Sequence, residues 1–149
     1  MKLHTYISII LNFLILNLVF SQEETTKFYI TEIRGDISLE MEINNLESNK
    51  GPIYIRILDE NENPVIVGTS PVINYSAKIS FDSISAGKYA IQFFHDENEN
   101  QKMDFNLIGI PKEKFGSSND VKPILGPPKF EKMLFEIYQD KKIVMKPVN

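Results

Sequence analysis

Residues 89–104 read YAIQFFHDENENQKMD. The stretch begins with an apolar and aromatic run that is typical of a β-strand. The run ends at side chains that carry oxygen atoms at every second position, Asp96, Asn98 and Asn100, and Asp104 closes the segment. Asp and Asn side chains directly after a strand bond to nearby backbone amides and form tight turns. The stretch therefore predicts a strand that leads into an oxygen-lined loop at the edge of a β-structure.

Other short segments have the same β character. Residues 37–43 read ISLEMEI, and this alternation of apolar and polar side chains predicts a strand with one buried face. Residues 130–137 follow two prolines and are rich in aromatic side chains, so we favour a strand over a helical turn there. Further strands are expected at residues 28–33, 52–58, 65–67, 76–81, 88–94 and 143–148. Because polar turns separate these segments, we expect an all-β fold, an antiparallel β-sandwich of about seven strands of the immunoglobulin-like or prealbumin-like type.

Residues 105–125 contain glycine, proline and serine without a sustained period. A loop of this length inside one domain is usually functional or disordered. The apolar side chains of this loop predict that it packs against the body of the domain. They are Phe105, Leu107, Ile110 and Phe115.

The N-terminal segment has the features of a signal peptide. Lys2 precedes an apolar run at residues 7–20, which is short for a membrane span and suits the hydrophobic region of a signal peptide. Ser21 is a small residue after this run, so cleavage is expected between Ser21 and Gln22. An uncleaved signal anchor is the alternative.

The domain organisation follows from this boundary. We expect a signal peptide at residues 1–21 and a single β-sandwich domain at residues 22–149. The mature chain then has no membrane span and is exported, either to the periplasm or to the extracellular space.

Composition and charge exclude several kinds of site. The net charge of −4 argues against binding to a nucleic-acid backbone, which requires clustered Lys and Arg. The chain has no cysteine, so neither a disulfide nor a thiolate ligand is available. Once His4 is removed with the signal peptide, His95 is the only histidine left, which excludes a zinc site with two imidazoles from one chain.

Several motifs resemble known exported domains. The pattern F-x-x-I-x-x-G-x-Y-A-I at residues 81–91 resembles a corner of prealbumin-like and carboxypeptidase-regulatory-like sandwiches. More specifically, FFHDENENQKMD at residues 93–104, GIPKEKFGSSN at residues 109–119 and GPPKF at residues 126–130 resemble DUF2141, a bacterial family of exported domains. The resemblance implies the sandwich fold and export, and it implies no activity. The chain departs from the family pattern at Gln101, where the family usually has glycine.

The loop after residue 95 has the donor spacing of a calcium loop. Asp96, Asn98 and Asn100 occupy positions 1, 3 and 5, the Lys102 carbonyl falls at position 7, and Asp104 falls at position 9. Position 12 lacks the bidentate glutamate of an EF-hand. The candidate metal ligands are completed by a residue from outside the loop, Glu113.

One feature of the loop itself counts against a strong site, and the alternative to metal stays open. Gln101 stands where calcium loops have glycine, and a positive φ at a residue other than glycine costs about 1 kcal/mol. The oxygen atoms can instead accept hydrogen bonds from the loop's own backbone, with no ion bound. Calcium is therefore the cofactor the spacing allows, and a hydrogen-bonded turn is the other interpretation.

The pentapeptide DENEN occurs twice, at residues 59–63 and at residues 96–100. In the first copy Val67 stands at position 9, so an ordinary acidic turn is expected there. If two strand reversals separate the copies, both loops lie at one pole of the sandwich.

His95 is expected on the core face of its strand, with a hydrogen bond to a neighbouring loop. No catalytic residue is assigned. The favoured function is a non-enzymatic exported module, expected to be a monomer, that binds a protein or a glycan at its loop-bearing pole and uses calcium as a clip. The alternative is a metal-assisted hydrolase that uses Asp96, Asp104, Glu113 and His95.

Overall fold

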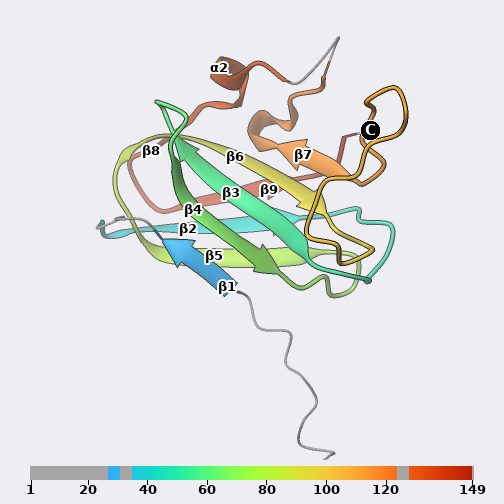
Figure 1. Cartoon of the computed structure of the whole chain (residues 1–149). Helices are drawn as coiled ribbons and strands as arrows, with labels where there is room; N and C mark the ends of the chain where they lie inside the picture. The colour runs from blue at the N-terminus through green and yellow to red at the C-terminus, as the bar shows by residue number, and fades with distance from the viewer. Residues whose placement is uncertain (1–26, 31–34, 124–127, 149) are drawn as a thin grey trace, which may run out of the picture.

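The computed structural model describes residues 27–30, 35–123 and 128–148. The expected signal peptide at residues 1–21 lies outside them. Figure 1 shows strands in two layers, with few helical residues. In chain order, the elements are β1 (Lys27–Ile30), β2 (Ile37–Ile43), β3 (Ile53–Asp59), β4 (Pro64–Ser70), β5 (Ala77–Ile84), β6 (Gly87–His95), β7 (Phe115–Ser117), η1 (Ser118–Asp120), α2 (Phe130–Met133), β8 (Phe135–Ile137) and β9 (Lys141–Met145).

The strands form two sheets. The larger sheet has the order β1-β4-β3-β6-β7, and β8 pairs with the first residues of β6. All of these pairs are antiparallel. The smaller sheet has the order β5-β2-β9, in which β2 is antiparallel to β5 and parallel to β9. The fold is therefore an all-β sandwich with mostly antiparallel strands, as the sequence predicted.

The hydrophobic core lies between the sheets and is built by strand alternation. In β2, the alternate residues Leu39, Met41 and Ile43 are all buried. In the larger sheet, Ile57 of β3 pairs with Ile91 of β6, and both side chains are fully buried. Burying an aliphatic side chain of this size contributes about 1.5–3 kcal/mol to stability.

One predicted strand is wrong in its first half, and one strand was not predicted. Residues 130–137 form the helical turn α2 followed by the short strand β8, and the turn buries Met133 against the sheet. Ser118 Oγ donates a hydrogen bond to the Met133 carbonyl, which holds the turn in place. The unpredicted strand is β7, whose three residues pair with β6.

The prediction that the two DENEN loops share a pole is wrong. In the β3–β6 pairing, Asp59 lies opposite Tyr89 and Ile53 lies opposite His95. The loop of residues 59–63 therefore lies at one end of the sandwich and the 96–104 loop at the other. The reason is β4, which is a full strand rather than the brief segment expected at residues 65–67, and it adds a third reversal.

Among the described residues, no helix has the length and apolar character needed to cross a membrane.

Candidate functional site

The 96–104 loop begins at a fixed point of the fold. The Asp96 side chain is completely buried, and its amide donates to the Pro52 carbonyl at 3.0 Å. Just before it, the His95 amide donates to the Lys114 carbonyl at 2.7 Å. On the other side, the backbone of Gly51 lies directly against the Asp96 carbonyl, at a φ of +68°. The first residue of the loop is thus held between two neighbouring segments.

The carboxylate of Asp96 organises the first half of the loop. Its Oδ1 accepts a hydrogen bond from the Asn100 amide at 3.1 Å, and its Oδ2 accepts one from the Gln101 amide at 2.7 Å. Asn98 Oδ1 also accepts from the Asn100 amide, and Asn100 Oδ1 accepts from the Lys102 amide. Gln101 has a φ of 64°, the left-handed conformation in which calcium loops often place a glycine at this position.

Asp104 closes the loop from the other side. Its Oδ2 accepts hydrogen bonds from Asn98 Nδ2 at 2.7 Å and from Asn100 Nδ2 at 2.9 Å. Each asparagine therefore bonds to the loop backbone through its oxygen and to Asp104 through its nitrogen. Lys102 contributes its amide to these turns, and its side chain is exposed.

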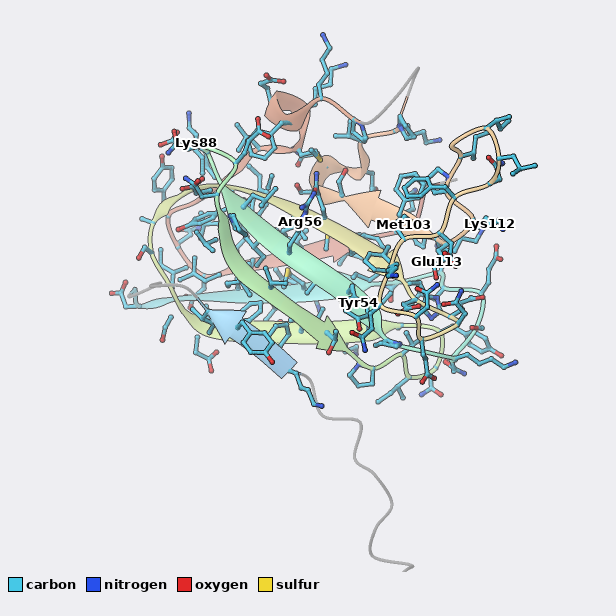
Figure 2. The ribbon with its side chains drawn as sticks, in the orientation of Figure 1. Tyr54, Arg56, Lys88, Met103, Lys112 and Glu113 are labelled. Atoms are coloured by element: carbon cyan, nitrogen blue, oxygen red, sulfur yellow. The ribbon has the colours of Figure 1, made fainter. Side chains whose placement is uncertain are left out.

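Glu113 reaches the loop from the following segment, as the sequence predicted (Figure 2). Its Oε2 accepts a hydrogen bond from the Asp104 amide at 3.2 Å, while its Oε1 is buried and accepts no hydrogen bond from a protein donor. Burial raises the pKa of the Glu113 carboxyl, and the negative charges of Asp96 and Asp104 and a side-chain hydrogen bond with Asp96 raise it further. The carboxyl groups of Glu113, Asp96 and Asp104 therefore lie close together at the loop. Among the described residues, no basic side chain is paired with Glu113.

This arrangement does not have the form of a finished metal site. In the part of the chain that the structure describes, no three His, Cys, Asp or Glu side chains are placed so as to hold one metal ion together. The amide nitrogens of Asn98 and Asn100 face Asp104, where a cation would require oxygen atoms. Cation binding therefore needs local rearrangement of side chains.

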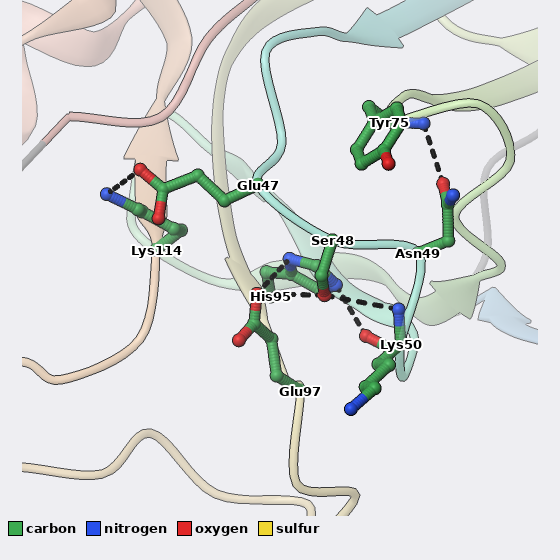
Figure 3. Close-up of polar contacts among 8 residues, drawn as sticks. All are labelled: Glu47, Ser48, Asn49, Lys50, Tyr75, His95, Glu97 and Lys114. Carbon is green, nitrogen blue, oxygen red and sulfur yellow. Dashed lines mark hydrogen bonds and ion pairs between the residues drawn. The ribbon is translucent and has the colours of Figure 1, made fainter.

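His95 lies between Glu97 and the segment that carries Ser48 and Lys50 (Figure 3). The buried ring donates a hydrogen bond from Nε2 to the Lys50 carbonyl at 2.7 Å, which agrees with the predicted bond to a neighbouring loop. Its Nδ1 has no hydrogen-bond partner and lies 3.5 Å from Glu97 Oε1. The same Glu97 oxygen accepts a hydrogen bond from Ser48 Oγ at 3.0 Å. His95 and Glu97 thus tie the segment before β3 to the start of the 96–104 loop, and neither ring nitrogen engages Glu113.

The first DENEN copy provides an internal comparison. Asp59 Oδ1 accepts from the amides of Asn61 and Asn63 at 2.9 and 2.8 Å, and Oδ2 accepts from Asn63 Nδ2 at 3.1 Å. These bonds, led by those from Asn63, lower the pKa of Asp59. The loop is a self-contained acidic turn, as expected. In the second copy the corresponding asparagine is Asn100, and its side-chain nitrogen Nδ2 donates a hydrogen bond to Asp104 instead.

Sequence reasoning missed the role of Gly51 and wrongly placed the apolar side chains after the loop. Gly51 is far from Asp96 in sequence, and no local pattern signals their contact. Of the apolar residues expected to pack on the body, Phe105, Leu107 and Ile110 are exposed, and Phe115 packs as part of β7. The reason is that residues 105–110 fold back on themselves in a closed turn.

Comparison with known proteins gives one match. A family described as "Uncharacterized protein conserved in bacteria (DUF2141)" matches residues 41–145, which include the 96–104 loop and all of the strands except β1 and the first residues of β2. No curated protein and no solved structure matches the chain.

Proposed function

Since the chain belongs to the DUF2141 family of uncharacterized bacterial proteins, we propose a function from the chemistry of its own loop: an exported, non-enzymatic binding module whose 96–104 loop is stabilised by calcium. The module acts in the periplasm or outside the cell. The ligands would be the side chains of Asp96, Asn98, Asn100, Asp104 and Glu113 together with the Lys102 carbonyl.

The observation that carries the calcium proposal is the environment of Glu113. Its Oε1 is buried and accepts no hydrogen bond from a protein donor, and its carboxyl adjoins those of Asp96 and Asp104. A buried polar atom without a partner costs about 1–3 kcal/mol, and neighbouring like charges add to that cost. A cation among the three carboxyl groups would offset both.

The donor chemistry favours calcium over other metals. All of the candidate donors are oxygen atoms, and calcium takes six to eight oxygen ligands in flexible geometry. Zinc and copper prefer nitrogen and sulfur ligands, and the single buried histidine is bonded elsewhere. The closing of the loop by its own residues suits a structural clip rather than an open catalytic metal.

The proposed partner is a protein or a glycan, bound by the monomeric domain at the pole that carries the 96–104 loop. Ser70 of β4 lies beside Ile53, and Ile53 lies beside His95, so the β4–β5 loop reaches the same pole. That loop exposes Ile73 and Tyr75, and Tyr75 is held by a hydrogen bond from its amide to Asn49 Oδ1. Exposed aromatic and aliphatic side chains on a fixed loop favour contact with a partner.

A calcium titration followed by thermal melting tests the clip. Sites with few charges and no bidentate glutamate bind at roughly 10⁻⁴ to 10⁻³ M. At a tenfold excess over that constant, linkage stabilises the fold by about 1.4 kcal/mol. For a domain of this size the melting temperature would rise by roughly 3–6 °C. Unchanged melting in millimolar calcium, relative to EDTA, would refute the clip.

A further inference from the structure

The most exposed apolar segment of the described chain is the turn of residues 105–110, FNLIGI, which we call the apolar finger. It follows directly on the 96–104 loop, and in Figure 2 it projects at the edge of the molecule near the labelled Lys112. Its exposed apolar residues, with the exposed fraction of each, are Phe105 at 55%, Leu107 at 106%, Ile108 at 79% and Ile110 at 53%. Such a cluster on one convex tip differs from singly scattered surface residues and marks an interaction site.

The finger is preformed by one asparagine. Asn106 Oδ1 accepts hydrogen bonds from the amides of Ile108 and Ile110, at 3.0 and 2.9 Å. The Asn106 amide donates to the Ile110 carbonyl, and the Gly109 amide donates to the Asn106 carbonyl. These four amides are therefore satisfied inside the turn. That condition matters for entry into hydrocarbon, where no water is present to bond to an unpaired backbone group.

The base of the finger is fixed to the domain. Phe105 and Pro111 form an antiparallel bridge, and the Lys112 amide donates to the Asp104 carbonyl at 2.8 Å. Two exposed lysines, Lys102 and Lys112, flank the finger in the sequence. The loop before the finger also exposes Glu97 and Glu99, whereas Asp104 and Glu113 accept hydrogen bonds within the loop.

We propose that the apolar finger inserts into the surface of a lipid bilayer that contains anionic phospholipid. A tip exposed on all sides needs a surrounding apolar phase, whereas a flat protein surface would cover only one side of it. Side chains of Leu and Ile enter the boundary between headgroups and acyl chains, and lysines beside them attract anionic headgroups. The proposal does not depend on calcium binding.

Vesicle sedimentation tests the insertion. The protein as isolated from the producing cell is mixed with vesicles of equal parts phosphatidylglycerol and phosphatidylcholine, and with vesicles of phosphatidylcholine alone. We expect binding to the mixed vesicles, and the double variant Leu107→Ser/Ile108→Ser should lower the affinity roughly 10- to 100-fold. The control Tyr138→Ser/Val144→Ser removes two exposed apolar residues of another region and should bind as the parent does. Both variants keep the same N-terminus, so any contribution of the N-terminal residues to vesicle binding is the same in both.

A fluorescent reporter at the tip gives a second measurement. The chain has no tryptophan, so Leu107→Trp introduces a single indole. Its emission should shift to the blue with mixed vesicles, and Tyr138→Trp should show no shift. Absence of binding to the mixed vesicles overturns the proposal, as does equal binding of the Leu107→Ser/Ile108→Ser variant.

Discussion

The backbone of Gly51 lies so close to Asp96 that a Cβ atom at Gly51 would overlap the carbonyl oxygen of Asp96. Gly51 also has a φ of +68°, which side chains rarely tolerate. The segment before β3 can therefore approach the buried start of the 96–104 loop only because residue 51 has no side chain. The position of the 96–104 loop therefore depends on a glycine that lies outside the loop.

We expect Gly51→Ala to destabilise the domain by about 2 kcal/mol or more, because the new methyl group meets backbone that cannot move aside. The matched control is Gly109→Ala, where φ is also positive, at +78°, but no atom lies within 4 Å of the new Cβ. That variant should lose only about 1 kcal/mol. Urea unfolding of both variants measures the difference, and equal losses would show that strain in φ, rather than the overlap, limits residue 51.

Export is predicted from residues outside the described structure. The Lys2-led apolar run that ends at Ser21 predicts a mature chain that begins at Gln22. Intact-mass measurement of the protein recovered from the periplasm or medium should give the mass of residues 22–149. A recovered mass that still includes residues 1–21 would support an uncleaved anchor instead.

The sequence predicted strands well where one side of the strand is buried. The alternation in residues 37–43 gave β2 with its bounds, because a half-buried strand must place apolar residues at every second position. The same pattern did not reveal β7, because Phe115–Ser117 has no alternation of apolar and polar residues and is a strand only through its pairing with β6. It also failed to recognise β4 as a full strand, and that single omission reversed the predicted position of the 59–63 loop.

The local chemistry of the site was predictable, and its surroundings were not. The turns that Asp96, Asn98 and Asn100 form with their own backbone follow from short-range spacing. Glu113 was expected beside the loop and bonds to the Asp104 amide. The contact with Gly51 joins residues distant in the chain, so only the pairing of β3 with β6 creates it.

The raised pKa of Glu113 predicts a pH dependence of stability. A carboxyl whose pKa is higher in the folded state than its ordinary value of 4.5 holds its proton more tightly when folded. In EDTA, its contribution to stability should therefore fall as pH rises from 4.5 through the raised folded value. Glu113→Gln should remove that slope.

Asp59 has a lowered pKa, so its contribution is lost at lower pH, as pH falls below its ordinary value of 3.8. Unfolding free energies across this range separate the two groups, and an unchanged slope in Glu113→Gln would assign the effect elsewhere.

Calcium should remove the same pH dependence, because a cation beside Glu113 favours its ionised form. In saturating calcium, the stability of the parent protein should no longer fall as pH rises through that window. A slope that is identical in calcium and in EDTA would mean that the ion does not reach Glu113.

The two copies of DENEN allow the calcium proposal to be tested within one molecule. Asp96→Asn and Asp104→Asn should each abolish the rise in melting temperature caused by calcium, since each removes one of the few charges available to the ion. Asp59→Asn is the matched control, because it makes the same change in the same pentapeptide at the opposite pole, and it should keep nearly the full rise. The quantity compared is the calcium-induced shift of each variant, so a change in its calcium-free stability does not affect the result. If Asp59→Asn loses the shift while Asp96→Asn keeps it, calcium binds at the 59–63 turn. If all three variants keep it, calcium stabilises the domain through neither loop.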